Sequence, residues 1–331
     1  MRREWSVAIA IALLAIVLAF AAPAYFSGEN LRDLVLVNLP LLVIGTGTTL
    51  VILTGEIDIS VGSAFAVCSV AAGVAAGLGV PAAAAGAVSC AAGAALGAAN
   101  GALVAYLRIP SIVVTLAAMV AWRDALRWAT GGAWIENLPP RFQWLGLPQT
   151  SFPLAAGGGV AILVAVTAWT MRNVAVGRAV YATGANGEAA RLASIDTSLV
   201  KLAVFTCAGA LTGLAALLNS VRFNQIPSNT GLGLEMKVIA AVVVGGAAIT
   251  GGRGTFTGTV LGVVLLGAIG PALTFLGVSA QWERALQGAI ILAAVTIDAG
   301  RATSQRLTRR DRPQRTQRPQ GSRGSGSLAG G

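Results

Sequence analysis

Residues 54–63 read TGEIDISVGS, and they separate two apolar stretches, 35–54 and 60–79, each about long enough to cross a bilayer. Ionised carboxylates are costly at membrane depth, yet Glu56 and Asp58 lie here, two residues apart. On an α-helix such residues diverge by about 200°, whereas in an extended segment they point to the same side. The spacing therefore predicts a non-helical link with both carboxylates on one side.

Glycine and serine residues frame this link. Gly55 and Gly62 stand on either side of the carboxylates and favour a break in the helix. We expect Ser60 or Ser63 to be the N-cap of the helix that follows. The stretch then joins two membrane helices, either at the aqueous end of the spans or in a re-entrant turn that faces protein.

The composition of the whole chain is that of a membrane protein. Hydrophobic residues make up 55% of the 331 residues and charged residues only 11%, and the mean hydropathy is +0.75. An average soluble domain carries roughly 25% charged residues. We therefore predict an all-α, polytopic membrane protein.

Ten apolar segments of suitable length follow one another along the chain. An even number places both termini on one side, and the excess of arginine and lysine there predicts that this side is the cytoplasm. The transmembrane domain is expected over 1–300, followed over 301–331 by a basic, disordered cytoplasmic tail. A cleaved signal peptide is the alternative for the first segment. The expected spans are 7–25, 35–54, 60–79, 82–106, 111–129, 155–171, 199–219, 238–252, 256–277 and 284–299.

Several chemistries are excluded by residues that the chain lacks. It has no histidine, and Cys68, Cys90 and Cys207 lie in apolar runs without a paired spacing, so we expect neither a metal site nor a disulfide. The two lysines, Lys201 and Lys237, do not follow glycine, so the G-x-x-x-x-G-K-[ST] phosphate loop is absent. We expect no enzyme activity and no cofactor bound by this chain. The basic tail favours contact with membrane lipid over nucleic acid.

Glycines repeat at a spacing of four residues in or directly beside three of the apolar segments. Such repeats let helix backbones approach closely in a membrane, so they predict tightly packed helices. The repeats are Gly93, Gly97 and Gly101; Gly209 and Gly213; and Gly254, Gly258 and Gly262.

Four longer motifs appear in order: TGEIDISVGS (54–63), NGALVAYLRIPSIVVTLAAM (100–119), YATGANGEAARLASI (181–195) and IAAVVVGGAAITGGRGTFTGTVLG (239–262). Together they resemble the permeases of bacterial ABC importers of the ribose, arabinose and xylose type. The resemblance implies a multi-pass protein of the inner membrane that pairs with a second permease protomer as a homodimer or heterodimer. It also implies a periplasmic sugar-binding protein and a separate cytoplasmic ATPase subunit, which binds the ATP.

The choice of cargo rests on two further segments. WATGGAWIENLP (128–139) and IPSNTGLGLEMKVIAAVVVGG (226–246) most resemble the rhamnose and autoinducer-2 permeases. The resemblance favours a permease for rhamnose, with autoinducer-2 or another pentose or hexose as the alternative. An ATP-independent secondary carrier is a further alternative, which the lack of histidine and of paired acidic residues deep in the spans opposes.

The longest predicted cytoplasmic connection, 172–200, contains a short segment of helical composition. Its Glu188 and Arg191 are spaced i, i+3, which is typical of a solvated helix with one ion pair or of a docking helix for a partner. The resemblance favours the docking helix. It implies that the loop coupling the permease to its ATPase consists of Gly187, Glu188, Ala189, Ala190 and Arg191.

The remaining candidate residues concern the path of the cargo. We expect the link to have a gating and structural role at the cytoplasmic mouth, with direct sugar binding and an inert wet turn as alternatives; its residues are Gly55, Glu56, Asp58, Ser60, Gly62 and Ser63. Polar residues in or beside apolar spans are candidates for contact with the sugar, although hydrogen bonds between helices are the alternative for each. These are Asn100, Ser111, Thr115, Asn219 and Ser220.

Two predicted outer loops carry further candidate residues. The loop 128–153 carries three tryptophans, which are typical of a membrane-interface belt and alternatively of a docking surface for the binding protein. The loop 221–237 carries Arg222, Glu235 and Lys237, which could extend that surface.

Overall fold

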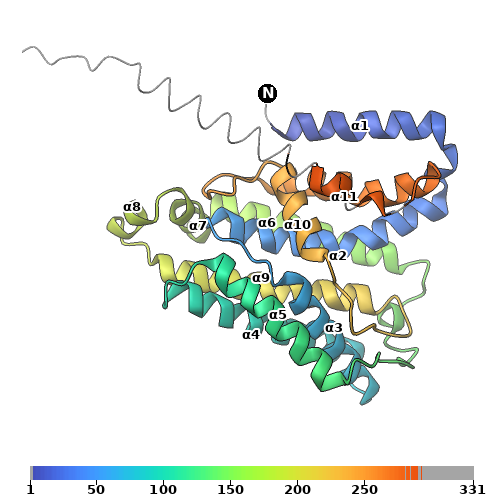
Figure 1. Cartoon of the computed structure of the whole chain (residues 1–331), viewed down its shortest axis with the longest axis horizontal. Helices are drawn as coiled ribbons and strands as arrows, with labels where there is room; N and C mark the ends of the chain where they lie inside the picture. The colour runs from blue at the N-terminus through green and yellow to red at the C-terminus, as the bar shows by residue number, and fades with distance from the viewer. Residues whose placement is uncertain (1–2, 280, 284, 290–291, 293–331) are drawn as a thin grey trace, which may run out of the picture. The chain divides into compact units, whose positions relative to one another are not determined.

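The chain folds into a bundle of α-helices in the computed structural model, which describes residues 3–279, 281–283, 285–289 and 292 (Figure 1). No β-strand occurs in these ranges, so the all-α expectation is confirmed for them. The elements are α1 (Arg3–Ala21), η1 (Pro23–Phe26), α2 (Gly28–Leu53), α3 (Val61–Gly77), α4 (Ala82–Ala105), α5 (Ser111–Thr130), η2 (Gln143–Gly146), α6 (Phe152–Asn173), α7 (Ala175–Ala185), α8 (Gly187–Leu192), α9 (Thr197–Ser220), α10 (Leu234–Val244) and α11 (Phe256–Phe275).

Six of the described helices are long and apolar enough to cross a membrane, namely α1, α2, α4, α6, α9 and α11. Helix α3 is apolar but has only 17 residues, and α5 carries three charged residues toward its C-terminal end. The expected tenth span, 284–299, lies largely outside the described residues, and the tail 301–331 lies wholly outside them. The count of ten spans and the side of the termini therefore stay predictions.

The expected boundaries of the eighth span are wrong. The segment 238–252 was expected as one helix, but α10 runs from Leu234 to Val244. The chain then turns back toward α11 through Gly246, Gly251 and Gly252, whose φ angles are 102°, 83° and 70°. Only glycine adopts such angles at little cost, so the helix ends although the composition stays apolar.

The most extensive helix packing in the bundle joins α4 to α9, and glycine makes it possible. A Cβ atom on Gly97 would overlap the carbonyl oxygen of Phe205, and one on Gly213 would overlap that of Ser89. Gly93 and Gly209 stand in the same close contact with each other. The prediction that these repeats mark close helix contacts is confirmed, and Gly258 and Gly262 do the same between α11 and α10.

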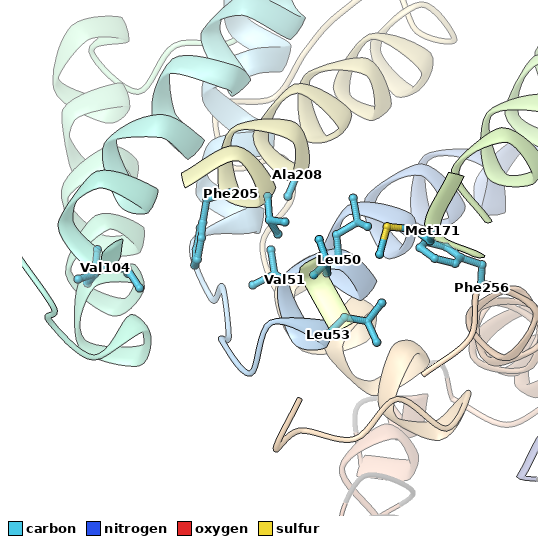
Figure 2. Close-up of a cluster of buried hydrophobic side chains, with 11 residues drawn as sticks. Leu50, Val51, Leu53, Val104, Met171, Phe205, Ala208 and Phe256 are labelled. Carbon is cyan, nitrogen blue, oxygen red and sulfur yellow. The ribbon is translucent and has the colours of Figure 1, made fainter. Parts of the chain in front are cut away.

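A cluster of buried apolar side chains lies where the ends of several helices converge (Figure 2). Leu50, Val51 and Leu53 from the last turn of α2 are at most 6% exposed. They pack with residues of α4, α5, α6, α7, α9 and α11, and so fix the end of α2, from which the TGEIDISVGS link departs. The other members are Val104, Val114, Met171, Val180, Val204, Phe205, Ala208 and Phe256.

Candidate functional site

The link between α2 and α3 is non-helical from Gly55 to Ser60, as the sequence predicts. Helix α2 ends because Gly55 has a φ angle of 83°. Asp58 is 7% exposed, and its Oδ1 accepts hydrogen bonds from the Ser60 amide at 2.9 Å and the Ser60 hydroxyl at 2.6 Å. Burial raises the pKa of the Asp58 carboxyl, and the two bonds from Ser60 oppose that shift.

Ser60 holds the N-cap position of α3, but its hydroxyl does not cap the helix. The hydroxyl instead donates to Asp58 and accepts from the side-chain amide of Asn100 at 2.9 Å. The Ser63 hydroxyl donates to the Ser60 carbonyl at 2.8 Å. Asp58, Ser60 and Asn100 therefore form one buried chain of hydrogen bonds from the link to α4.

Two more residues expected along the cargo path hold the link against α5. The Ser111 hydroxyl accepts from the Ile57 amide at 3.1 Å, and the Thr115 hydroxyl lies 3.4 Å from the Ile57 carbonyl. Like Asn100, both side chains are buried. Three of the five candidates thus make hydrogen bonds between elements, and their contact with cargo stays a prediction.

The two carboxylates of the link serve different helices. Glu56 forms an ion pair with Lys201 near the start of α9, whereas Asp58 is bonded toward α4. The spacing predicts both carboxylates on one side of the link, but it does not predict that they bond to different helices. Lys201 is a site residue that is not among the sequence candidates, although a lone lysine at one end of an apolar helix signals a charged partner.

A pocket of about 330 Å³ lies beside this ion pair. It collects charged side chains from four segments that are distant in sequence: the link, the turn between α4 and α5, helix α8 and the start of α9. Arg191 of the predicted coupling loop shares the pocket with Glu56. The charged residues that line it are Glu56, Arg108, Arg191, Asp196 and Lys201.

The residues predicted to couple the permease to its ATPase, Gly187 to Arg191, form most of α8, which is a short and exposed helix. The Asn186 side chain caps it by accepting hydrogen bonds from the amides of Glu188 and Ala189 at 3.1 and 3.0 Å. Arg191 donates from Nε to the Thr197 hydroxyl at 3.0 Å, which joins α8 to α9. No ion pair joins Glu188 to Arg191 within the described ranges. Leu192 is 90% exposed, so α8 ends in an open apolar side chain.

The motif YATGANGEAA meets the link and the turn between α10 and α11. A Cβ atom on Gly184 would overlap the carbonyl oxygen of Leu53, the same oxygen that accepts a hydrogen bond from the Gly252 amide at 2.9 Å. The Tyr181 hydroxyl donates to the Gly254 carbonyl at 2.9 Å. All four sequence motifs therefore converge at one place, which we call the motif junction.

The two predicted outer loops, 128–153 and 221–237, follow the C-terminal ends of α5 and α9, away from the motif junction. Hydrogen bonds between their backbones join the two loops. Ile135 and Ile226 exchange backbone hydrogen bonds of 3.0 and 2.8 Å, and the Trp144 amide donates to the Val221 carbonyl at 2.7 Å. The second loop lines a cavity of about 1230 Å³ together with Asn219 and residues of α2, α3 and α10. Lys237 and Glu283 face each other there at 2.7 Å.

The last two candidate residues differ in their placement. Asn219 lines the large cavity, so it is accessible to a solute there. Ser220 is 2% exposed, and its hydroxyl has no hydrogen-bond partner. Among the residues that the structure describes, no group of His, Cys, Asp or Glu side chains is arranged to hold a metal ion.

A family model described as "Branched-chain amino acid transport system / permease component" matches residues 30–295. The chain belongs to this family. The permease called Autoinducer 2 import system permease protein LsrC in Escherichia coli is 36% identical over 292 residues, which cover 87% of this chain and 85% of the relative. LsrC of Salmonella paratyphi B is 36% identical over 309 residues, covering 92% and 89%. No solved structure matches the chain.

Membership of this permease family agrees with the sequence motifs and with the six apolar helices. The chain is a transport component of the ABC importer type and a multi-pass protein of the inner membrane. An ATPase subunit and a solute-binding protein are the partners that this family implies.

Proposed function

We propose that this permease carries autoinducer 2, or a small hydroxyl-rich solute like it, through an ABC importer powered by a separate ATPase. The observation that carries the proposal is the match to LsrC over nearly the whole length of both chains. Rhamnose, which the sequence motifs favour as cargo, gains no support from these relatives. The name of the family mentions branched-chain amino acids, whereas both relatives named above are autoinducer-2 permeases.

The large cavity supports a neutral cargo. Its Lys237 and Glu283 are bonded to each other, and Gln287 donates to the same Glu283 oxygen at 2.9 Å. Lys237 and Glu283 thus satisfy one another, and Glu235, which also lines the cavity, lies within electrostatic reach of Arg123, so amide groups such as Asn219 are left for the solute. Amides and apolar surface suit hydroxyl groups better than they suit a zwitterion.

We also propose that α8 is the docking element for the ATPase, with the motif junction as the joint that transmits its movement. Glu188, Ala189, Arg191 and Leu192 are exposed, while Ala190 and the Arg191–Thr197 bond fix the helix to the bundle. A push on α8 reaches the end of α2, from which the link departs, because Gly184 of the preceding helix touches Leu53. Displacing the link would strain the Glu56–Lys201 pair and so open or close the path at this end.

The test is uptake in a bacterial strain deleted for its own autoinducer-2 and rhamnose importers. The chain would be produced with the ATPase and binding protein of its own organism, and removal of autoinducer 2 from the medium would be followed beside labelled rhamnose and labelled leucine. We expect autoinducer 2 alone to be removed. An ATPase variant lacking its phosphate-loop lysine is the control and should abolish removal.

Two results would overturn the proposal in different ways. Uptake of rhamnose or leucine without removal of autoinducer 2 would refute the cargo. Uptake that continues with the inactive ATPase and collapses with the proton gradient would refute the importer mechanism. The docking role has its own test: Glu188→Lys with Arg191→Glu should abolish co-purification of the ATPase while the amount of permease stays unchanged.

A further inference from the structure

A second hollow, of about 410 Å³, is formed by the start of α2 and the two predicted outer loops, and we call it the outer pocket. It shares no lining residue with the large cavity. Charged and amide side chains line it together with one indole ring. The residues that matter here are Glu29, Arg32, Asp33, Trp144, Gln149 and Arg222.

Arg222 is fixed in the wall of the outer pocket by an interruption in α2. Pro40 lies inside that helix and has no N–H, so the Leu36 carbonyl lacks the partner that residue 40 normally supplies. Arg222 donates to this carbonyl from Nη1 at 3.2 Å. The centroid of the Phe223 ring lies 5.4 Å from the guanidinium carbon, so the ring covers one face of the group. Helix α2 and the aromatic ring therefore hold the guanidinium in one place.

The remaining donors of Arg222 have no acceptor among the described residues. Its Nε is buried without a hydrogen-bond partner, and its Nη2 makes no hydrogen bond in the same ranges. A buried donor without a partner is rare in native proteins and indicates a partner from outside the chain. Nε and Nη2 lie along one edge of the guanidinium, which fits two oxygen atoms side by side. The pocket thus offers a paired donor to a ligand with two adjacent oxygens.

Acceptors for the same ligand come from the start of α2. Glu29 and Asp33 are four residues apart, so they lie on one face of the helix, and both are exposed. Asp33 is within electrostatic reach of Arg222, yet no ion pair joins the two in the part of the chain that the structure describes. Since Arg32 and Arg222 balance the two acids, the lining carries no net charge. A neutral ligand that both donates and accepts hydrogen bonds suits this lining better than an ion does.

Trp144 supplies an apolar wall, and a strained backbone presents it. Trp144 and Leu145 have φ angles of 55° and 56°, in the left-handed region that bulky residues rarely adopt. The Trp144 ring packs edge to face on Phe152 with centroids 5.3 Å apart, and its amide donates to the Val221 carbonyl at 2.7 Å. Residues in such conformations cluster at sites that bind ligands. An indole in this position offers a flat surface to the carbon skeleton of a small solute.

We propose that the outer pocket binds a small neutral solute with two adjacent hydroxyl groups and holds it before it enters the large cavity. The two oxygens accept hydrogen bonds from Arg222, and the hydroxyl groups donate to Asp33 and Glu29. The carbon skeleton lies on the indole of Trp144. The proposal rests on the proposed function in one respect, namely that the cargo is rich in hydroxyl groups.

The position of the outer pocket suits a site of first contact. Leu36 lines the pocket and directly precedes Val37, which lines the large cavity. Arg222 follows Asn219, another residue of the cavity, by three positions. The two hollows are therefore neighbours along α2 and the end of α9. A solute released from the outer pocket has only about one helical turn to travel to reach the cavity.

Protection from a thiol reagent tests the site in the full-length permease, purified in lipid nanodiscs. Gln149→Cys places a thiol in the outer pocket, and Glu136→Cys, at an exposed position of the same loop outside the pocket, is the control. The native cysteines lie within apolar helices, out of reach of a charged maleimide in water. We expect saturating cis-1,2-cyclopentanediol to slow labelling of Gln149→Cys at least about threefold, and cyclopentanol, which has a single hydroxyl group, to have no effect. Equal slowing by the two compounds, or equal slowing at the two positions, would overturn the proposal.

Loss of one acceptor tests the chemistry of the site. In the Gln149→Cys chain, Asp33→Ala changes an exposed helix position, so the fold should persist, and protection should need about tenfold more diol. Asp124→Ala makes the same change on α5, where the side chain is 66% exposed and far from any pocket residue in the sequence, and should leave protection at the parental level. Unaltered protection in Asp33→Ala would refute the assignment.

The same labelling assay separates a solute site from a docking surface. If the solute-binding protein of the importer slows labelling of Gln149→Cys and the diol does not, the pocket receives a protein and the proposal is wrong. None of these measurements uses uptake or the ATPase, so failure of autoinducer-2 uptake leaves their result intact. Conversely, uptake of autoinducer 2 without protection by the diol would refute the outer pocket alone.

Discussion

Glu56 in the link after α2 forms an ion pair with Lys201 near the start of α9, and the pair is mostly shielded from solvent. The Glu56 side chain is 14% exposed and the Lys201 side chain 26%. The pair ties the non-helical link to the helix that follows α8. Any movement of α8 relative to the link therefore acts on these two charges.

Reversing one charge of this pair should destabilise the protein. Lys201→Glu leaves two acids together in a place that is mostly shielded from solvent, so we expect a loss of about 1–3 kcal/mol in the free energy of unfolding. Glu56→Lys with Lys201→Glu restores the attraction and should recover most of the loss. Both are measured by unfolding in detergent, followed by the reaction of buried Cys68 with a thiol dye after Cys90 and Cys207 have been replaced by alanine. A double variant no more stable than the single one would show that the pair contributes nothing.

Asp58 should make stability depend on pH in a direction opposite to an ordinary salt-bridged acid. Its pKa is raised in the folded state, so the native protein holds the proton more tightly than the unfolded chain does. Stability then falls as the pH rises from the unfolded pKa of about 3.9 through the raised folded value, and stays at the lower level above it.

Asp58→Asn tests this sign. Asparagine keeps an oxygen that can accept from Ser60 but has no charge to bury, so the variant should equal or exceed the parent in stability at pH 8. The difference should shrink as the pH is lowered toward about 4. Thermal unfolding of both proteins across this range gives the comparison. A variant less stable than the parent at pH 8 would mean that the ionised carboxylate is stabilising.

Much of the fold could be predicted because it depends on local properties. Apolar length set most helix positions, and the spacing of Gly93 and Gly97 was enough to identify a close helix contact. The end of α10 was missed because it depends on left-handed glycines inside an apolar stretch. The partner of Asn100 could not be predicted, since a polar residue in a span shows the need for a hydrogen bond but not which element supplies it.

Gly97→Ala should be far more harmful than an alanine elsewhere in a membrane helix. The new Cβ would collide with the Phe205 carbonyl and push α4 away from α9, which we expect to cost about 1–3 kcal/mol or more. Gly158→Ala in α6 is the matched control, because no atom lies within 4 Å of its Cβ position. That variant should be neutral or more stable by up to about 1 kcal/mol. Equal unfolding temperatures for the two variants would refute the close contact.

Asn186→Ala should loosen α8 without affecting the bundle. Loss of the two cap hydrogen bonds costs about 1 kcal/mol, which lowers the population of this short helix up to about fivefold. Limited trypsin digestion of the purified chain should then cut after Arg191 about fivefold faster, since cleavage follows local opening. Asn186→Asp retains the acceptor and should be cut at the parental rate. Faster cutting in both variants would point to a cause other than the cap.

Gly184 and Gly187 lie three residues apart in one motif, and the structure predicts opposite results for them. A Cβ atom on Gly184 would overlap the Leu53 carbonyl and crowd the Gly252 amide that is bonded to it, whereas nothing lies within 4 Å of the Cβ position of Gly187. Gly184→Ala should therefore cost about 1–3 kcal/mol, although alanine favours a helix more than glycine does.

The same pair of variants tests whether the motif junction transmits movement. If α7 acts on the link through this contact, Gly184→Ala should lower ATP-driven uptake more than its loss of stability lowers the amount of folded permease. Gly187→Ala should leave both quantities at the parental level, because its side chain meets only open space. Uptake per folded molecule, measured for both variants at a temperature well below unfolding, separates the two effects. An unchanged value in Gly184→Ala would show that α8 acts on the path by another route, such as the bond from Arg191 to Thr197.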